Sequence, residues 1–221
     1  MTTGFLVDFL ARKAQVARYL EVVEAHERAI EPGEAAAAAA ELLTVLRAAP
    51  SLVRFTQVGA SLRGAVEAIH DRIVTERVPL QRLTDTIRRD VIRSFKARCD
   101  PDLHLNMNDI PIELVAIALD IEAGYPFSGN VDAKKVREIA DIYGFDTTTA
   151  REVTRDGADL LTVKSLRNDL AHGVKTYDEV GRNYTASDLK ELGDRSIAYV
   201  EAILTAVDRF VTERRFLRAP P

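Results

Sequence analysis

The sequence predicts an all-α protein, and three observations carry that prediction. Apolar residues recur three and four positions apart through most of the 221 residues, which is the spacing of one helix face. The alternation of apolar and polar residues that marks strands is rare, and the chain holds only 11 glycines and 8 prolines. Its 47% hydrophobic and 29% charged residues are typical of a folded protein with one sizeable core. We therefore expect a single domain over residues 1–221.

Residues 1–48 are expected to form an N-terminal helical extension of this domain. A first helix should run from Thr3 to about Ile30, where Glu31-Pro32-Gly33 ends it. Its apolar stripe consists of Phe5, Phe9, Val16, Leu20 and Val23. A second helix should run from Glu34 to about Ala48, because its six consecutive alanines have the highest helix propensity.

Two further helices are predicted on either side of Pro79. Ser51 can cap the first, and the second runs from Leu80 to about Arg98. The apolar stripe of the second helix is Leu83, Ile87, Val91 and Phe95. Its basic side chains form either an RNA-binding strip or a solvated face, and they are Arg88, Arg89, Arg93, Lys96 and Arg98. A loop over residues 102–109 and a short helix after Pro111 should follow.

The last part of the chain should form three helices. Asp132 caps the first of them, and Gly144 ends it. Asp156 is expected to cap the next one, and Gly173 should end it in a left-handed conformation. The apolar stripe of that second helix is Leu160, Val163, Leu166 and Leu170. Residues 174–183 are expected to be a loop, and a final helix begins at Thr185 or Ser187 and continues through Phe210.

The net charge and the composition exclude several classes of protein. A formal net charge of -4 and a pI near 5.7 exclude a protein that coats nucleic acid non-specifically, because such binding neutralises many phosphates. Cys99 is the one cysteine of the sequence, so an intramolecular disulfide is excluded. The sequence shows neither a signal peptide nor a run of about 18 uncharged apolar residues. We expect a cytoplasmic protein that does not enter a membrane.

Metal ligands are not apparent in the sequence. The histidines outside the motif described below have no His, Cys or acidic companions at metal-ligand spacing, and they are His26, His70 and His104. We expect these three to be structural, and we expect no bound metal or cofactor.

The residues that could perform chemistry lie between Arg167 and Gly173, which read RNDLAHG. Cleaving RNA without a metal needs a base for the 2′-hydroxyl, an acid for the leaving 5′-oxygen, and positive charge for the transition state. Histidine side chains change protonation near neutral pH, whereas arginine stays charged and binds phosphate with a planar fork. We assign these roles to His172 and Arg167, with Asn168 assisting from the same helix face as His172.

The spacing of the motif raises a geometric difficulty. Five residues along a regular helix rotate a side chain by about 140°, which places Arg167 and His172 on different faces. Either the helix unwinds before Gly173, or two copies pack about a two-fold axis and combine their motifs in one cleft. We favour the dimer, because its groove would also gather Lys164 and Lys175 and let an acidic protein bind RNA.

The string RNDLAHG resembles the signature of the HEPN superfamily. The resemblance extends to residues 127–132 (FSGNVD), to the helix ending at Tyr143-Gly144 and to residues 161–185; it covers about residues 51–217 and leaves the first 48 unassigned. It implies an all-α helical bundle of the HEPN type that forms a homodimer, with the arginine and histidine in the cleft between subunits. It also implies metal-independent RNA cleavage that leaves 2′,3′-cyclic phosphate and 5′-hydroxyl ends.

The resemblance further implies a toxin of a toxin-antitoxin or phage-defence system, held by an antitoxin protein. The expected catalytic residues are Arg167, His172 and Asn168. The expected substrate-binding residues are Lys164, Asp169, Lys175 and Tyr177. In HEPN toxins neutralised by a nucleotidyltransferase, the modified tyrosine stands two residues after the histidine, but Val174 occupies that place here. We do not expect that form of neutralisation unless Tyr177 replaces the missing tyrosine.

Three alternatives remain open. Some HEPN domains bind RNA or a partner protein without cutting. A purely structural dimerisation protein is the second alternative. Arg167 could, thirdly, serve only as the partner of an acidic side chain such as Asp159 or Asp169.

Overall fold

The computed structural model describes residues 2–29, 57–99, 131–184 and 186–219. Within these ranges every regular element is helical, as predicted, and the β-type pairing consists of one isolated bridge between Leu83 and Leu217. Several predicted features lie outside the described residues. They are the end of the first helix at residues 31–33, the helix from Glu34 to Ala48, the Ser51 cap, the loop over 102–109, the role of His104 and the helix after Pro111.

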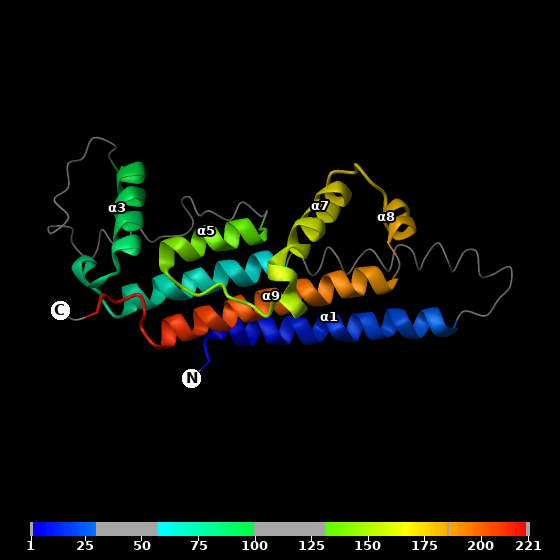
Figure 1. Ribbon diagram of the computed structural model, residues 1–221, viewed down its shortest axis with the longest axis horizontal. Helices are drawn as coiled ribbons and strands as arrows, with labels where there is room; N and C mark the ends of the chain where they lie inside the picture. The colour runs from blue at the N-terminus through cyan, green and yellow to red at the C-terminus, as the bar shows by residue number, and fades with distance from the viewer. Residues whose placement is uncertain (1, 30–56, 100–130, 185, 220–221) are drawn as a thin grey trace.

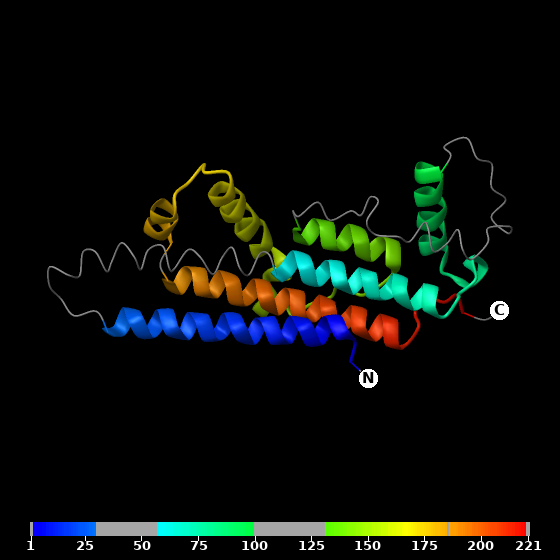
Figure 2. The same cartoon turned by 180° about the vertical axis from the view of Figure 1, so that it is seen from behind.

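Long helices run side by side along the long axis of the molecule (Figures 1 and 2). They are α1 (Gly4–Ala29), a helix covering residues 57–75, and α9 (Ala186–Thr212). The side chain of Thr3 donates to Asp208 at 2.7 Å, and the Lys13 ammonium lies 2.5 Å from Glu201. Because the start of α1 thus meets the end of α9, these two helices are antiparallel.

Shorter helices cover one side of this layer. In both views α3 (Asp85–Cys99) stands at one end, α5 (Ala133–Tyr143) lies along the helix of residues 57–75, and α7 (Asp159–Ala171) projects from the other half. After α7 the chain forms α8 (Tyr177–Asn183) before it enters α9. In the part of the chain that the structure describes, no helix combines the length and the apolar character needed to cross a membrane.

One large apolar core joins most of these helices. Its fully buried side chains come from every long element, for example Phe9, Ile69, Ile87, Ile139 and Ile203. Burying a side chain of this size stabilises the fold by roughly 1.5–3 kcal/mol. The stripe predicted for α3 is buried as expected, since Leu83, Ile87, Val91 and Phe95 are all at most 3% exposed. Phe9 of the predicted N-terminal extension therefore shares a core with the rest of the fold.

A second, smaller apolar cluster holds the motif helix. It contains residues of α7, α8 and the first turns of α9, namely Val163, Leu166, Val180, Leu189 and Leu192, with Leu170 and Tyr184 packed against it. Most of the stripe predicted for α7 is thus buried, and its last member, Leu170, is only partly buried. The orientation of α7 depends on this local cluster and on polar contacts at its base.

The ends of α5 confirm the predicted signals. Asp132 is the N-cap, and its Oδ1 accepts a 2.9 Å hydrogen bond from the backbone N–H of Lys135. Gly144 ends the helix with a φ of +89°, and its N–H donates to the carbonyl of Ala140 at 2.6 Å. A side-chain acceptor at the start and a left-handed glycine at the end satisfy backbone groups that a helix leaves unpaired.

The predicted cap of α7 is wrong. Asp156 adopts a φ of 52° inside a short 3₁₀ turn, η2 (Arg155–Gly157), and Ala158 occupies the N-cap position of α7. The polar stretch before it, which the sequence left unassigned, forms the single turn α6 (Arg151–Thr154). The chain reverses between α6 and α7, and the residues at the bend take left-handed conformations that a helix cap does not have.

Gly157 makes this reversal possible. Its φ is +76°, and a Cβ there would lie 2.8 Å from the ring of Tyr199 and 2.9 Å from the Cβ of Ala133. Any larger residue would therefore be strained in its backbone and would collide with buried side chains. The bend brings the base of α7 directly against α9.

Two other predictions needed correction. Residues 174–183 are not all loop, because residues 177–183 form α8, whose start is fixed by a capping box between Thr176 and Glu179. The helix expected from Leu80 is broken into a 3₁₀ turn, η1 (Leu80–Arg82), and α3. Leu83 between them is extended and fully buried, so burial of this side chain accompanies the break.

Candidate functional site

The motif occupies the end of α7. His172 is the C-cap residue, and its backbone N–H donates to the carbonyl of Asn168 at 2.9 Å. Gly173 follows with a φ of +67°, and its N–H donates to Leu170 at 3.3 Å. The left-handed glycine predicted as the helix terminator is thus confirmed. His172 lies at the very end of the helix, where its side chain is exposed.

The chain turns back immediately after the motif. The N–H groups of Val174 and Lys175 both donate to the carbonyl of Asp169, at 2.8 and 3.2 Å. These bonds satisfy a carbonyl that the helix end would otherwise leave unpaired. Val174 is 70% exposed, so the two residues on either side of Gly173 both face solvent.

Arg167 is partly buried and contacts its neighbour in the motif. Its Nη1 donates a 2.9 Å hydrogen bond to Oδ1 of Asn168. On a helix Asn168 lies about 100° from Arg167 but only about 40° from the direction of His172. The bond therefore draws the guanidinium round toward the face that Asn168 shares with His172. Part of the expected angular separation is removed within one chain, although α7 remains helical through Ala171.

The two lysines predicted to bind substrate each contact a carboxylate. Lys164 donates to Asp132 at 2.9 Å, and Lys175 donates to Asp169 at 2.6 Å. The hydrogen bond from Lys164 lowers the pKa of Asp132, with a smaller contribution from the backbone N–H of Lys135. The hydrogen bond to Asp169 raises the pKa of Lys175. The ion pair of Lys164 thus links α7 to the N-cap of α5, and the ion pair of Lys175 links the turn after the motif to α7.

Asp169 lies within the motif, and Tyr177 lies just after it along the chain. Asp169 is half-buried on α7, and its side chain accepts a hydrogen bond from Lys175. Tyr177 is the first residue of α8 and is 36% exposed. Both side chains are thus at least partly accessible to solvent.

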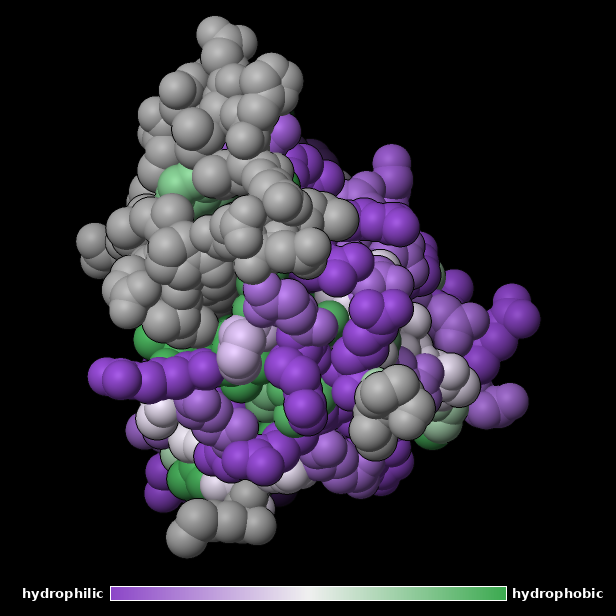
Figure 3. All heavy atoms as spheres, turned by 90° about the vertical axis from the view of Figure 1, so that its left-hand side faces the viewer, coloured by the Kyte–Doolittle hydropathy of each residue, from purple (hydrophilic) through white to green (hydrophobic). Residues whose placement is uncertain are grey.

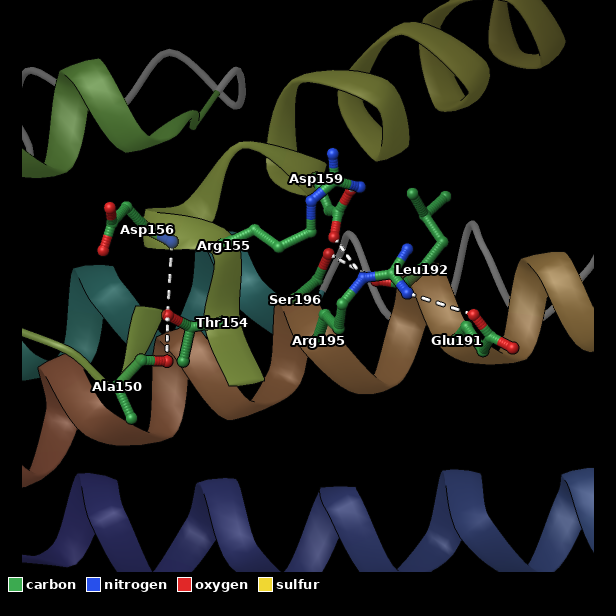
Figure 4. Close-up of polar contacts among 9 residues, drawn as sticks. All are labelled: Ala150, Thr154, Arg155, Asp156, Asp159, Glu191, Leu192, Arg195 and Ser196. Carbon is green, nitrogen blue, oxygen red and sulfur yellow. Dashed lines mark hydrogen bonds and ion pairs between the residues drawn. The ribbon is translucent and has the colours of Figure 1, made fainter. Parts of the chain in front are cut away.

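An ion-pair network centred on the buried Asp159 supports the base of α7, and no pattern in the sequence predicts it (Figure 4). Asp159 is 5% exposed and accepts a 2.5 Å hydrogen bond from Nε of Arg195 and a 3.2 Å bond from Arg155. Arg195 also contacts Glu191 at 3.2 Å. The hydrogen bond to Asp159 raises the pKa of Arg195. Because Asp159 and Arg195 are 36 positions apart and lie on different helices, only the folded chain brings this pair together.

This network bears on the alternative role of Arg167. The acids considered as its partners are Asp159 and Asp169, and both carry other ion pairs in this structure. The guanidinium of Arg167 donates a hydrogen bond to the carboxamide of Asn168. Because arginine stays protonated at neutral pH, this side chain can bind a phosphate group with its planar fork.

A family model, HEPN_MAE_28990-like HEPN, matches residues 63–216. The chain belongs to this HEPN family. No curated protein and no solved structure matches the chain. The HEPN match begins in the helix of residues 57–75 and ends just after α9, so it includes α7 and the whole motif, while α1 precedes it.

The titratable groups outside the motif include a buried histidine. Among the described residues, no group of three or more His, Cys, Asp or Glu side chains is placed to hold a metal ion. His70 is 6% exposed, and its Nε2 lies 2.7 Å from the hydroxyl of Tyr143 on α5. This buried pair links two helices of the core, which agrees with the structural role predicted for His70.

Proposed function

We propose that this HEPN domain is a metal-independent endoribonuclease. The observation that carries the proposal is the end of α7, where an exposed His172 shares a helix face with Asn168, whose side chain accepts a hydrogen bond from the Arg167 guanidinium. HEPN domains are often RNases, which supports the same assignment. Arg167 and His172 are the proposed catalytic residues, and Asn168 assists by positioning Arg167.

The proposed reaction uses the 2′-hydroxyl of the substrate as nucleophile. A neutral His172 takes the proton of that hydroxyl while its oxygen forms a bond to the adjacent phosphorus. Arg167 stabilises the negative charge that develops on the phosphoryl oxygens. The bond to the 5′-oxygen breaks, and this oxygen receives a proton from a second imidazolium. The products are a 2′,3′-cyclic phosphate and a 5′-hydroxyl.

A homodimer would supply the second imidazole. Leu161, Ser165, Asn168 and His172 follow one another at i, i+4, i+7 and i+11, along the side of α7 opposite its buried stripe. Leu161 is 57% exposed, although apolar side chains of this size are usually buried. A second copy packed on this face would cover Leu161 and bring the partner's His172 toward the same cleft.

The physiological role that we propose is that of a toxin in a toxin-antitoxin or phage-defence system in the cytoplasm. An antitoxin protein would then cover the motif or the dimer face. Lys164, Asp169, Lys175 and Tyr177 are the proposed substrate-binding residues around the motif. Phosphate binding by either lysine requires exchange of its present carboxylate partner for the RNA backbone.

Two observations favour a second candidate, an interaction module that binds RNA or a protein without cutting it. Lys164 and Lys175 both have carboxylate partners, which reduces the positive field beside the motif. Leu161 and Val174 are exposed apolar side chains near it, a feature of protein-binding surfaces. This candidate predicts binding without new RNA ends.

The two candidates are separated by incubating the full chain with RNA in a chelator. The ribonuclease predicts chelator-resistant cleavage that is lost in Arg167→Ala and in His172→Ala. Arg151→Ala is a matched control, because its side chain is 81% exposed and lies outside the motif. RNA binding without cleavage by the unmodified chain, with all variants folded, would support the interaction module and contradict the ribonuclease.

A further inference from the structure

The end of the molecule that carries α3 and the C-terminal residues concentrates positive charge. The described residues 71–96 and 208–218 hold eleven Lys and Arg against six Asp and Glu, a formal charge of +5, in a chain whose net charge is -4. We give the name arginine end to the surface formed by eight of the arginines in these stretches, namely Arg72, Arg77, Arg82, Arg88, Arg89, Arg214, Arg215 and Arg218. The sequence indicated only the part of this group that lies on α3.

Backbone contacts bring the two stretches together. The N–H of Thr84 donates to the carbonyl of Phe216 at 3.0 Å, and the N–H of Arg218 donates to the carbonyl of Arg82 at 2.7 Å. The bridge between Leu83 and Leu217 lies between these two bonds. The chain after α9 is thus fixed against the turn before α3, and the arginines of both segments share one surface.

Carboxylates at this end are shared between arginines. The carboxylate of Glu76 contacts the guanidinium groups of Arg72 (2.5 Å) and Arg214 (2.9 Å). The carboxylate of Asp85 likewise contacts those of Arg88 (3.1 Å) and Arg218 (3.9 Å). One carboxylate can neutralise only one unit of positive charge. Each group therefore keeps a surplus cation, and guanidinium forks remain available for phosphate oxygens.

Two of these arginines stand where a helix end favours glycine. Arg77 follows the helix of residues 57–75 with a φ of 49°, and Arg214 follows α9 with a φ of 55°. In both places the next N–H reaches back to the last turn, from Val78 to Ile73 at 3.0 Å and from Arg215 to Phe210 at 2.9 Å. A left-handed conformation costs a residue with a Cβ energy that glycine avoids. The sequence keeps a cation at both positions despite that cost.

The described surface around these arginines is poor in apolar anchors. Within residues 71–96 and 208–218, the large apolar side chain that is exposed is Val74, at 37%. Figure 3 looks onto this end and shows hydrophilic side chains over most of its described surface. Protein interfaces depend on apolar or aromatic anchors at their centre, whereas a nucleic-acid backbone is bound largely by cations. This composition favours nucleic acid over an acidic protein as the ligand.

We propose that the arginine end is an RNA-anchoring surface separate from the catalytic motif. The choice of RNA as the polyanion rests on the proposed ribonuclease function. α3 and α7 project to the same side of the long helices, with α5 between them (Figures 1 and 2). A strand held at the arginine end can thus extend along that side to His172. The surface binds backbone phosphates without reading sequence.

The test measures RNA binding without cleavage. The full chain with His172→Ala is titrated against a fluorescent single-stranded RNA at several salt concentrations. The test variant adds Arg82→Gln, Arg89→Gln and Arg215→Gln, which are exposed residues of the arginine end. The control adds Arg12→Gln, Arg18→Gln and Arg28→Gln, which remove the same charge from exposed positions of α1. Thermal melting of each variant reports its fold.

The proposal predicts about tenfold weaker binding by the test variant and no more than twofold weaker binding by the control. The slope of log affinity against log salt should fall by about 2, because each lost phosphate contact removes about 0.7 for a single strand. Equal losses in folded test and control variants would overturn the proposal. So would displacement of the RNA by polyglutamate at equal charge concentration, which would indicate a site for acidic proteins.

The anchoring surface and the ribonuclease can fail separately. If RNA binding depends on the arginine end but the chain never cleaves RNA, the ribonuclease proposal is refuted and the anchoring-surface proposal stands. If cleavage depends on His172 but the test variant binds RNA as tightly as the control, the ribonuclease proposal stands and the anchoring-surface proposal is refuted.

Discussion

The guanidinium of Arg167 is hydrogen-bonded to the side chain of Asn168, its immediate neighbour, at 2.9 Å. Because Asn168 shares a helix face with His172, this contact directs Arg167 toward that face without a change in the path of α7. The carboxamide therefore has a positioning role in the proposed reaction, and that role can be tested apart from the acid-base step.

Asn168→Ala should lower the rate of RNA cleavage about tenfold while leaving the melting temperature nearly unchanged. The hydrogen bond to a charged group contributes about 1.5–3 kcal/mol, and its loss lets the guanidinium leave the phosphate. Steady-state kinetics should show the effect in kcat, because the geometry matters most in the transition state. Ser165→Ala, an exposed position on the same face, is the control. Equal rates for both variants would show that Asn168 does not position Arg167.

Lys175→Ala should raise KM for RNA severalfold and leave kcat unchanged, if Lys175 binds backbone phosphate outside the reacting centre. The matched control is Lys134→Ala, because Lys134 is 82% exposed on α5 and lies outside the motif. An unchanged KM for Lys175→Ala would mean that this lysine serves only its ion pair with Asp169. Cleavage assays over a range of RNA concentrations distinguish the two results.

Asp132→Asn should reduce the free energy of unfolding by about 1 kcal/mol at neutral pH, a magnitude expected for a partly exposed ion pair. The pKa of Asp132 is lowered in the folded protein, chiefly by the hydrogen bond from Lys164. A carboxyl of this kind stabilises the fold above its unfolded pKa, near 3.8, and the contribution is lost as the pH falls through the folded pKa. Chemical denaturation at pH 7, 5, 4 and 3 should show the difference between wild type and variant shrinking below pH 4. A difference that stays constant to pH 3 would exclude this origin.

Gly157→Ala should destabilise the fold by about 3 kcal/mol. The new Cβ would meet the Tyr199 ring at 2.8 Å and would sit on a residue with a φ of +76°, which combines overpacking with backbone strain. Gly144→Ala separates these effects, because Gly144 has a φ of +89° but open space around it. We expect about 1 kcal/mol there. Similar losses at the two positions would show that Tyr199 and Ala133 yield to the extra methyl group.

Local signals in the sequence predicted much of the fold. Asp132 and Gly144 mark the ends of α5, Gly173 ends α7, and the burial of Phe9 and Phe95 follows the 3.6-residue period. Each of these features depends on a few neighbouring residues. The helical class and the HEPN family were therefore accessible before the structure.

The errors arose where distant residues decide the structure. Asp156 looked like a helix cap, but the chain reverses there because Gly157 packs against Tyr199. The pairing of Asp159 with Arg195 joins α7 to α9 and has no local signal. One miss was avoidable, since Thr176 and Glu179 form a capping box that is visible in the sequence.

In the candidate site, too, the sequence predicted the local features and missed the contacts between distant residues. The sequence places Asn168 and His172 on one face, and the structure adds the contact that turns Arg167 toward them. The ion pair of Lys164 could not be predicted from spacing, because its partner is Asp132, 32 residues away.

The most direct measurement identifies the ends that the full chain produces when RNA is incubated with it in a chelator. Attack by the 2′-hydroxyl predicts fragments with 2′,3′-cyclic phosphate and 5′-hydroxyl ends, detected by mass spectrometry, and none from a substrate with 2′-deoxyribose at the cleaved position. His172→Ala should abolish these fragments. Cleavage of the 2′-deoxy substrate, or undiminished cleavage by His172→Ala, would contradict the account.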